Sequence, residues 1–335
     1  MHTRTWTLAL VLAGSCHAQA TGPEQVSLHK IWDQGRHNAF TDLIRFRGSF
    51  FCSFREADDH VGGDGKIRIL VSRDGEKWES AALLVEDGID LRDPKLSLTA
   101  DKRLMVVAGG SVYRGGKKLL GRQPRVAFSK DGHRWTAPRK VLSEGEWLWR
   151  VVWHQGKAWG VSYNAMVPEG QDWTLKLVSA PDGVQFTDVA QLKVPGRPNE
   201  TTIRFLSDGT LMALVRREGT PQLRPMAWIG TSQAPYTEWT WEETAMQVGG
   251  PNFIELPNGE LWAVTRDYRN GPKRVTSLCR MDRQSLTPLL TFPSGGDNSY
   301  GGLLWFKNLL WVSYYSGHEG KVSIYLAKVR LPKAK

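Results

Sequence analysis

One short pattern recurs six times along this chain. Each copy is a turn residue followed by a run of mostly apolar residues that reads as a β-strand, and the copies begin at Gly48, Lys102, Gly156, Gly209, Gly259 and Asn308. The starts are 49 to 54 residues apart. A second strand-like run precedes most copies, so each unit begins as a β-hairpin. A fixed period of this size indicates a repeat fold.

Six such units of about 50 residues account for most of the 335 residues. A four-stranded sheet cannot bury both of its faces alone, so repeated sheets pack against one another around an axis. We therefore predict an all-β fold, a six-bladed β-propeller, as a single domain over residues 21–335. The last unit lacks an outermost strand, and residues 26–32 are expected to supply it. An irregular pair of β-sandwiches would not explain the even spacing.

The first 20 residues have the features of an export signal. Arg4 is followed by an apolar run at residues 8–13, and Ala18-Gln19-Ala20 fits a cleavage site. We predict a signal peptide over residues 1–20 and a secreted or periplasmic protein. Lipid anchoring at Cys16 is the alternative. No apolar run reaches the roughly 20 residues that a membrane-spanning helix needs.

The chain is basic, with a formal net charge of +10. It contains no zinc-finger spacing or RNA-binding motif, so a nucleic acid is not the expected partner. An exported basic protein more plausibly meets an acidic glycan or glycoconjugate. The histidines His60, His154 and His318 are widely scattered, and we predict neither a metal nor an organic cofactor. A monomer is expected.

A second repeat lies out of phase with the first. Residues 72–78 and 129–135 share the pattern Ser-x-Asp-Gly-x-x-Trp, and residues 179–186 are a looser copy. Ser and Asp bond nearby backbone amides, and Gly takes a positive φ, so the pattern predicts a tight turn. These turns join the third and fourth strands of a unit. They are therefore expected on the face opposite the first-strand starts, with a structural role.

In a propeller of this strand order, first strands start and second strands end on one face around the central channel. The residues expected near the first-strand starts are Asp42, Asp93, Arg150, Glu200, Asn252 and Tyr300. Those expected at the second-strand ends are Arg55, Gly109, Tyr163, Arg216, Arg266 and Tyr315. Crowded charges beside a low-dielectric channel are costly unless they are paired or used. This rim is the candidate functional site, with structural salt bridges as the alternative interpretation.

The chain resembles the exo-α-sialidases (neuraminidases) over almost its whole predicted mature length. Residues 199–216, which run from Asn-Glu to Val-Arg, resemble the family's fourth-blade segment. Residues 298–305, Asn-Ser-Tyr-Gly-Gly-Leu-Leu-Trp, resemble its sixth-blade segment, and the Ser-x-Asp-Gly turns resemble its Asp-boxes. The family consists of six-bladed propellers that hold a sugar carboxylate with three arginines. They use a Tyr nucleophile, a Glu base and an Asp acid/base, unlike most glycosidases.

This resemblance implies that Tyr300 is the nucleophile, that Glu200 is its base and that Arg216 and Arg266 bind substrate, with Arg274 as an alternative to Arg266. A neutral phenol suits an anionic sugar, because a carboxylate nucleophile would repel the sugar's own carboxylate. The phenol has an ordinary pKa near 10, so it needs the neighbouring base.

The first blade departs from the family, which has an arginine where residues 40–43 read Phe-Thr-Asp-Leu. Arg55 is expected to replace that arginine. The acid is expected in the following loop, where Asp59 is the first choice and Asp58, Asp64 and His60 stay open. Asp42 and Asp93 are further predicted substrate-binding residues.

The resemblance implies a retaining exo-α-sialidase. Two alternatives remain open: a related hydrolase or lyase acting on another acidic glycan, and a glycan-binding propeller without catalysis.

Overall fold

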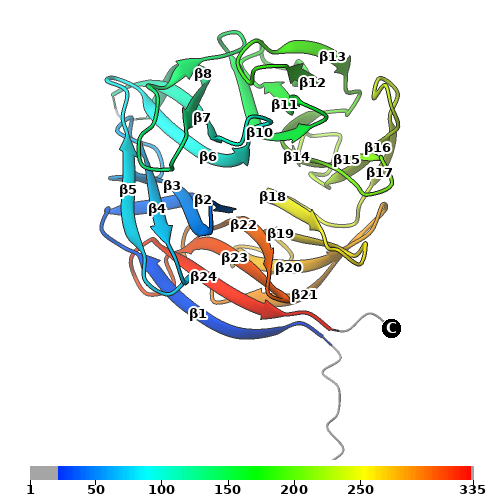
Figure 1. The fold of residues 1–335 in the computed structure, drawn as a ribbon. Coiled ribbons are helices and arrows are strands. Elements are labelled where there is room, and N and C mark those ends of the chain that lie inside the picture. The colour runs from blue at the N-terminus through cyan, green and yellow to red at the C-terminus, as the bar shows by residue number, and fades with distance from the viewer. Residues whose placement is uncertain (1–21, 116, 333–335) are drawn as a thin grey trace, which may run out of the picture.

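The computed structural model of the protein describes residues 22–115 and 117–332, so the predicted signal peptide and Cys16 lie outside the described residues. Over these residues the regular structure is entirely β: twenty-four strands form six four-stranded antiparallel sheets. The sheets surround a central axis as the blades of a propeller (Figure 1). The predicted six-bladed β-propeller is confirmed. The described chain contains no helix suited to crossing a membrane.

The blades follow one another along the chain, and within a blade the strands pair in sequence order. Blade 1 consists of β2 (His37–Phe46), β3 (Ser49–Ala57), β4 (Lys66–Ser72) and β5 (Glu79–Leu84). Blade 2 consists of β6 (Asp90–Leu98), β7 (Leu104–Arg114), β8 (Lys118–Ser129) and β9 (Arg139–Lys140). Blade 3 consists of β10 (Glu146–His154), β11 (Lys157–Asn164), β12 (Thr174–Ala180) and β13 (Thr187–Gln191).

The second half of the ring repeats this arrangement. Blade 4 consists of β14 (Arg197–Phe205), β15 (Leu211–Glu218), β16 (Trp228–Ser232) and β17 (Thr240–Glu243). Blade 5 consists of β18 (Val248–Glu255), β19 (Leu261–Asp267), β20 (Val275–Met281) and β21 (Leu286–Phe292). Blade 6 consists of β22 (Asn298–Phe306), β23 (Leu309–Ser316), β24 (Ser323–Arg330) and, from the start of the chain, β1 (Glu24–Trp32).

The N-terminal strand closes the ring. β1 pairs antiparallel with β24, from Glu24 opposite Arg330 to Trp32 opposite Ile324, and Figure 1 shows the two strands side by side. The expected role of residues 26–32 is confirmed. This pairing covers the edge of β24 that would otherwise be left without backbone partners.

The first strand of each blade contacts the first strands of the two neighbouring blades, so these six strands line the axis. Apolar clusters fill the space between adjacent blades. In one of them Phe51 and Ile69 of blade 1 meet Leu96 and Val106 of blade 2, and all four are buried. Burial of apolar surface between sheets therefore holds the ring together.

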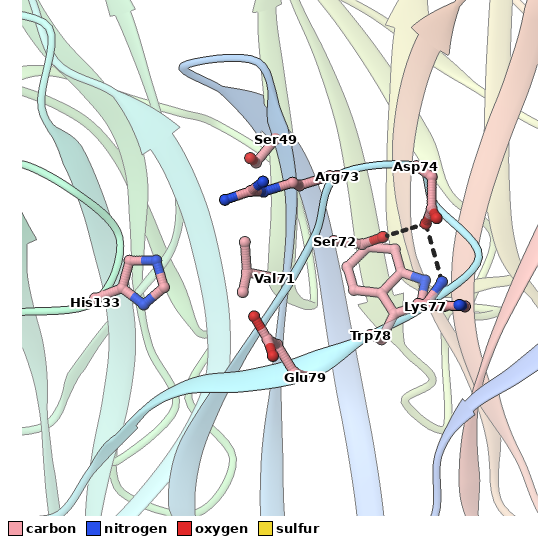
Figure 2. A pocket seen from close by; sticks show the side chains of 9 residues that line it. All are labelled: Ser49, Val71, Ser72, Arg73, Asp74, Lys77, Trp78, Glu79 and His133. Carbon is pink, nitrogen blue, oxygen red and sulfur yellow. Dashed lines mark hydrogen bonds between the residues drawn. The ribbon is translucent and has the colours of Figure 1, made fainter.

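The predicted Ser-x-Asp-Gly turns occur between the third and fourth strands of blades 1 and 2. In blade 1, Ser72 Oγ accepts a hydrogen bond from the Gly75 amide at 2.8 Å, and Asp74 accepts bonds from the Glu76 and Lys77 amides at 2.8 and 3.0 Å. Figure 2 shows this turn at a pocket also lined by His133 of blade 2. Because strands alternate in direction, the turns lie on the face opposite the first-strand starts, as expected.

Glycine is required in these turns because it tolerates a positive φ and because a larger residue would clash with the preceding blade. Gly75 has φ +78°, and a Cβ there would lie 2.3 Å from the Trp311 ring of blade 6. A Cβ on Gly132 would lie 2.2 Å from the Phe51 ring of blade 1. Each turn therefore packs against the second strand of the preceding blade and fastens two blades together.

We predict that Ser72→Ala lowers the free energy of unfolding by about 1–3 kcal/mol, because the buried amide of Gly75 loses its acceptor. Urea denaturation followed by tryptophan fluorescence measures the change. The exposed neighbour Arg73 provides a control, and Arg73→Ala should leave stability unchanged. Equal stability of Ser72→Ala and the wild type would contradict the structural role of the turn.

Candidate active site

All six first strands carry a bulge at the same level. Their pairing with the second strands skips two residues in every blade, namely residues 40–41, 93–94, 149–150, 199–200, 250–251 and 300–301. In four blades the first skipped residue has a positive φ: Phe40, Asp93, Gly250 and Tyr300. Bulges re-aim side chains, and strained non-glycine residues concentrate at functional sites.

Tyr300 of blade 6 and Glu200 of blade 4 meet at this level. The Tyr300 hydroxyl donates a hydrogen bond to Glu200 Oε1 at 2.7 Å. Arg216, on the second strand of blade 4, places Nη1 2.7 Å from Glu200 Oε2 and 3.0 Å from the Tyr300 hydroxyl. Its Nη2 contacts Glu218 at 2.5 Å. The contact between Tyr300 and Glu200 that the sequence predicted is therefore present, and Arg216 joins both groups.

Gly250 of blade 5 lies between these two blades and makes the contact possible. A Cβ at this position would lie 2.4 Å from Tyr300 Cγ, well inside van der Waals distance. The Gly250 amide also donates to Glu200 Oε2 at 2.7 Å. A glycine at the bulge thus leaves room for the tyrosine ring and supplies a hydrogen bond to the carboxylate.

The Tyr300 ring is held by other aromatic rings. Its centroid lies 5.0 Å from that of Phe40, 5.7 Å from that of Trp149 and 6.0 Å from that of Tyr315. The guanidinium carbon of Arg266 lies 5.2 Å from the ring centroid. The tyrosine is 6% exposed, so its position is set by packing on several sides.

Burial and charge set the protonation of this pair. Burial, together with the charge of Glu200, raises the pKa of Tyr300 well above its ordinary value. Burial acts to raise the pKa of Glu200 too, but the charge of Arg216 and the hydrogen bonds to the carboxylate outweigh it and lower that pKa. In the free protein Tyr300 is therefore a neutral phenol beside an ionised Glu200.

A second polar cluster lies next to Tyr300 and is centred on Asp297. Its Oδ1 accepts hydrogen bonds from Arg266 Nη2 and the Tyr315 hydroxyl, both at 3.0 Å. Its Oδ2 lies 3.0 Å from His37 Nε2 and 2.5 Å from His60 Nδ1. Burial acts to raise the pKa of Asp297, but the bonds from His37 and His60 and the charge of Arg266 hold it well below its usual value.

The ligand atoms of His37, His60 and Asp297 lie within 4.8 Å of one another, as a metal site would require. Two observations favour a hydrogen-bonded cluster instead. Arg266 places a positive charge on the same carboxylate. His37 Nδ1 is buried and has no hydrogen-bond partner among the described residues, whereas a metal-bound histidine normally donates its other ring nitrogen to an acceptor.

Arg55, predicted to bind substrate, has a different partner. Its side chain is 0% exposed and bonds both carboxylate oxygens of Asp90, from Nε at 2.7 Å and from Nη2 at 2.9 Å. Its Nη1 donates to the backbone oxygen of Asp59 at 2.6 Å. These bonds engage the guanidinium inside the protein, where it anchors the loop that follows β3. Arg55 is therefore placed as a structural residue and not as the substrate-binding residue that the sequence predicted.

Asp42, predicted to bind substrate, also has partners inside the protein. It lies beyond the bulge, and its buried Oδ2 accepts hydrogen bonds from the Leu96 amide and from Arg150 Nη1, both at 2.8 Å. The bulge adds residues that simple counting along the strand does not reveal. Asp42 and Arg150 therefore connect blades 1, 2 and 3 and do not line the site.

The first choice for the acid, Asp59, lies at the surface. Its side chain is 58% exposed, and Oδ2 pairs with Lys117 at 3.3 Å. Its hydrogen bond from the His60 amide and its pairing with Lys117 lower the pKa of the carboxyl, which opposes a role as proton donor. Asp58 and Asp64 are exposed as well. Of the four loop candidates, His60 is the one held at the Asp297 cluster.

Asp93 does reach the site. It occupies the bulge of blade 2, is 9% exposed, and its burial raises the pKa of the carboxyl although Arg92 and Lys95 act against this. The neighbouring Arg92 places its guanidinium 5.2 Å from the ring centroid of Phe40. Arg92 thus lies over the segment in which the family resemblance led us to expect an arginine.

Of the two fifth-blade arginines, Arg266 lies in the site. Arg274 is exposed and lies over the ring of Tyr268. Asp297, His37 and Arg92 were not among the residues predicted from the sequence. Asp297 directly precedes β22, and His37 and Arg92 lie near the starts of β2 and β6, so their places near first-strand starts are the signal that could have identified them. One residue was predicted for each first strand, whereas the bulges bring several to the site.

No family model and no curated protein matches the sequence. Solved structures do match the fold. A protein of unknown function from Dyadobacter fermentans is 19% identical with a TM-score of 0.80, covering 93% of this chain and 100% of that one. Trypanosoma rangeli sialidase, in complex with the inhibitor DANA, is 12% identical with a TM-score of 0.70, covering 88% of this chain and 55% of that one.

The α-L-arabinofuranosidase Arb93a from Fusarium graminearum is 15% identical with a TM-score of 0.70, covering 91% of this chain and 98% of that one. The neighbours therefore include glycosidases named for different sugars. At these identities the shared property is the fold. Function has to be argued from the site.

We predict that Gly250→Ala displaces the Tyr300 ring and lowers the free energy of unfolding by about 1–3 kcal/mol more than Gly259→Ala does. The control is matched, because Gly259 also has a positive φ, but a Cβ there would have no atom of the described residues within 4 Å. Both variants carry the backbone strain, and only one carries the clash. Urea denaturation and crystal structures of both variants measure the difference; an unmoved Tyr300 would contradict the argument.

We also predict that Arg55→Ala lowers the free energy of unfolding by about 3–5 kcal/mol, because Asp90 would be left buried without its counter-charge. Arg274→Ala, which changes an exposed arginine, is the control and should be neutral. Thermal and urea unfolding report the effect. A fully stable Arg55→Ala variant with weakened glycan binding would restore the substrate-binding role.

Proposed function

We propose that this protein is a retaining exo-glycosidase that removes a terminal acidic sugar, with sialic acid as the first substrate to test. The observation that carries the proposal is the contact of the Tyr300 hydroxyl with Glu200 and Arg216. A buried phenol bonded to an ionised carboxylate is a nucleophile with its base in place. Most glycosidases use two carboxylates, and a Tyr nucleophile marks the sialidase exception.

The chemistry follows from the protonation of the pair. Tyr300 carries its proton in the free enzyme because its pKa is raised. As its oxygen attacks the anomeric carbon, Glu200 Oε1 accepts the proton, so the phenolate never has to exist as a separate buried anion. Arg216 contacts both groups throughout and stabilises the charge that moves between them. Hydrolysis of the glycosyl–tyrosine then reverses the proton transfer.

The positive groups around Tyr300 support an acidic substrate. Arg216 bonds its hydroxyl and Arg266 lies against its ring. A sugar positioned for attack by Tyr300 would therefore lie beside two guanidinium groups from blades 4 and 5. Arginine binds carboxylates with paired hydrogen bonds, which fixes the orientation of the sugar.

A second substrate class is favoured by one departure from the family. Arg55 is locked to Asp90, and Phe40 occupies the first-blade segment where the family has an arginine. If Arg92 does not take over that contact, the carboxylate clamp differs from that of sialidases. A hydrolase for another acidic glycan then fits the same Tyr and Glu pair. Assays with aryl sialosides and aryl uronides separate the two.

We expect Tyr300→Phe and Glu200→Gln each to reduce turnover of the accepted aryl glycoside by orders of magnitude, and the double variant to be little worse than either, because the two residues act as one unit. Ground-state binding should survive in Tyr300→Phe. The measurements are kcat, isothermal titration calorimetry, and NMR of the first-formed anomer, which should show retention.

Tyr325→Phe is the control, since Tyr325 lies on β24, the third strand of blade 6, and its hydroxyl makes no hydrogen bond with Glu200, Arg216 or Asp297 in the described part of the chain. It should keep full activity. Binding of acidic glycans without turnover by the wild type would replace the proposal with a glycan-binding role. An inverted product would exclude a covalent tyrosine intermediate.

A further inference from the structure

His60 is held in a defined position although it lies on a loop. Arg55 Nη1 donates to the backbone oxygen of Asp59 at 2.6 Å, and Arg92 Nη1 donates to the backbone oxygen of His60 at 2.7 Å. Asp90, which pairs with Arg55, also accepts a hydrogen bond from the Gly63 amide at 3.3 Å. Buried charged groups thus fix the backbone on both sides of this histidine.

The imidazole is oriented as well. Its Nδ1 lies 2.5 Å from Asp297 Oδ2, and Asp297 is ionised because its pKa is held far below the usual value. Nδ1 therefore carries the hydrogen, and Nε2 is the atom that exchanges protons. Nε2 makes no hydrogen bond to the described residues, and the side chain is 42% exposed. An oriented histidine with one available nitrogen is the arrangement of a general acid or base.

This histidine lies beside the attacking group. The Phe40 ring contacts both, with its centroid 5.2 Å from that of His60 and 5.0 Å from that of Tyr300. The ionisable side chains near His60 include Asp297 of blade 6, His37 of blade 1, and Arg92 and Asp93 of blade 2. A sugar attacked by Tyr300 would therefore have its leaving group near His60, and Asp93 is the other ionisable side chain of this neighbourhood that could supply a proton.

We propose that His60, oriented by Asp297, is the general acid and base of the glycosidase reaction. This inference rests on the proposed function and replaces Asp59, which is exposed and paired with Lys117. Asp297 is a positioning residue. The dyad is assembled from blade 1 and blade 6, so it exists only when the ring is closed.

The proton transfers balance in both steps. First, Tyr300 Oη bonds to the anomeric carbon while its proton goes to Glu200, the glycosidic C–O bond breaks, and the leaving oxygen takes the proton from Nε2 of the His60 imidazolium. Second, water loses a proton to Nε2 as its oxygen bonds to the anomeric carbon. The bond from Tyr300 to the sugar breaks as the bond to water forms, and Glu200 returns the proton to Tyr300. The enzyme ends as it began.

Leaving-group dependence tests the inference. We expect His60→Ala to lose roughly 10²–10⁴-fold in kcat/KM on sialyllactose, whose sugar leaving group needs a proton, and to lose little on the first step with 4-nitrophenyl α-sialoside. Azide should accelerate turnover of the aryl substrate by His60→Ala and form a glycosyl azide, because this anion needs no base to attack. Loss of packing alone would produce neither effect.

The control is His29→Ala, because His29 also pairs with a carboxylate, Glu76 at 3.4 Å, but lies on the outer strand β1. It should match the wild type on both substrates. Equal losses by His60→Ala on both substrates without azide rescue would overturn the inference. It would also be overturned if Asp93→Asn, and not His60→Ala, lost activity on sialyllactose while keeping it on the aryl sialoside.

The experiments distinguish failure of the proposed glycosidase function from failure of the role proposed for His60. If the wild type hydrolyses both sialosides and Tyr300→Phe is inactive, the proposed function stands whatever His60→Ala shows. If the wild type hydrolyses neither sialoside nor any aryl uronide, the proposed function fails, and the role of His60 fails with it.

Discussion

The hydrogen bond from Tyr300 to Glu200 spans two blades that are not neighbours, and the arrangement around it follows from that span. Blade 5 lies between them, so its first strand must present a residue without a side chain, and Gly250 does so while donating its amide to Glu200. Arg216 balances the charge of the carboxylate. A pair built across the ring is sensitive to the relative position of three blades, which links the chemistry to the integrity of the propeller.

Pairing of buried charges explains why arginines of similar sequence context have different roles. Arg55 and Arg266 both end a second strand, yet Arg55 meets the fully buried Asp90 and becomes a structural anchor. Arg266 meets Asp297, which is partly exposed and is shared with two histidines and Tyr315. Exchanging the partner of an ion pair closed off from solvent leaves a buried charge uncompensated, whereas a pair that solvent can partly reach can accept a new ligand at lower cost. Local burial therefore separates anchors from candidate binding groups.

The same scaffold occurs in a sialidase, an arabinofuranosidase and a protein of unknown function, at identities of 12 to 19%. In this chain the Ser-x-Asp-Gly turns and the closure by β1 hold the ring, and the turns lie on the face opposite the candidate site. The bulges of the first strands carry Tyr300, Glu200 and Asp93 of the candidate site. A propeller can change its reaction by exchanging a few bulge and loop residues while its blades stay in place.

The repeat period, the alternation of apolar residues and the turn chemistry were readable in the sequence because they are local properties that recur in every blade. They determined six blades, the closing strand and the position of the Asp-boxes. The sequence also indicated Tyr300, Glu200, Arg216 and Arg266, since strand direction alone brings them to one face. It could not show that Arg55 is buried against Asp90, that a bulge shifts Asp42 out of the site, or that Asp297 gathers His37 and His60 from blade 1. Those facts depend on which side chains meet across the ring and how far each is removed from water, and only the tertiary structure decides this.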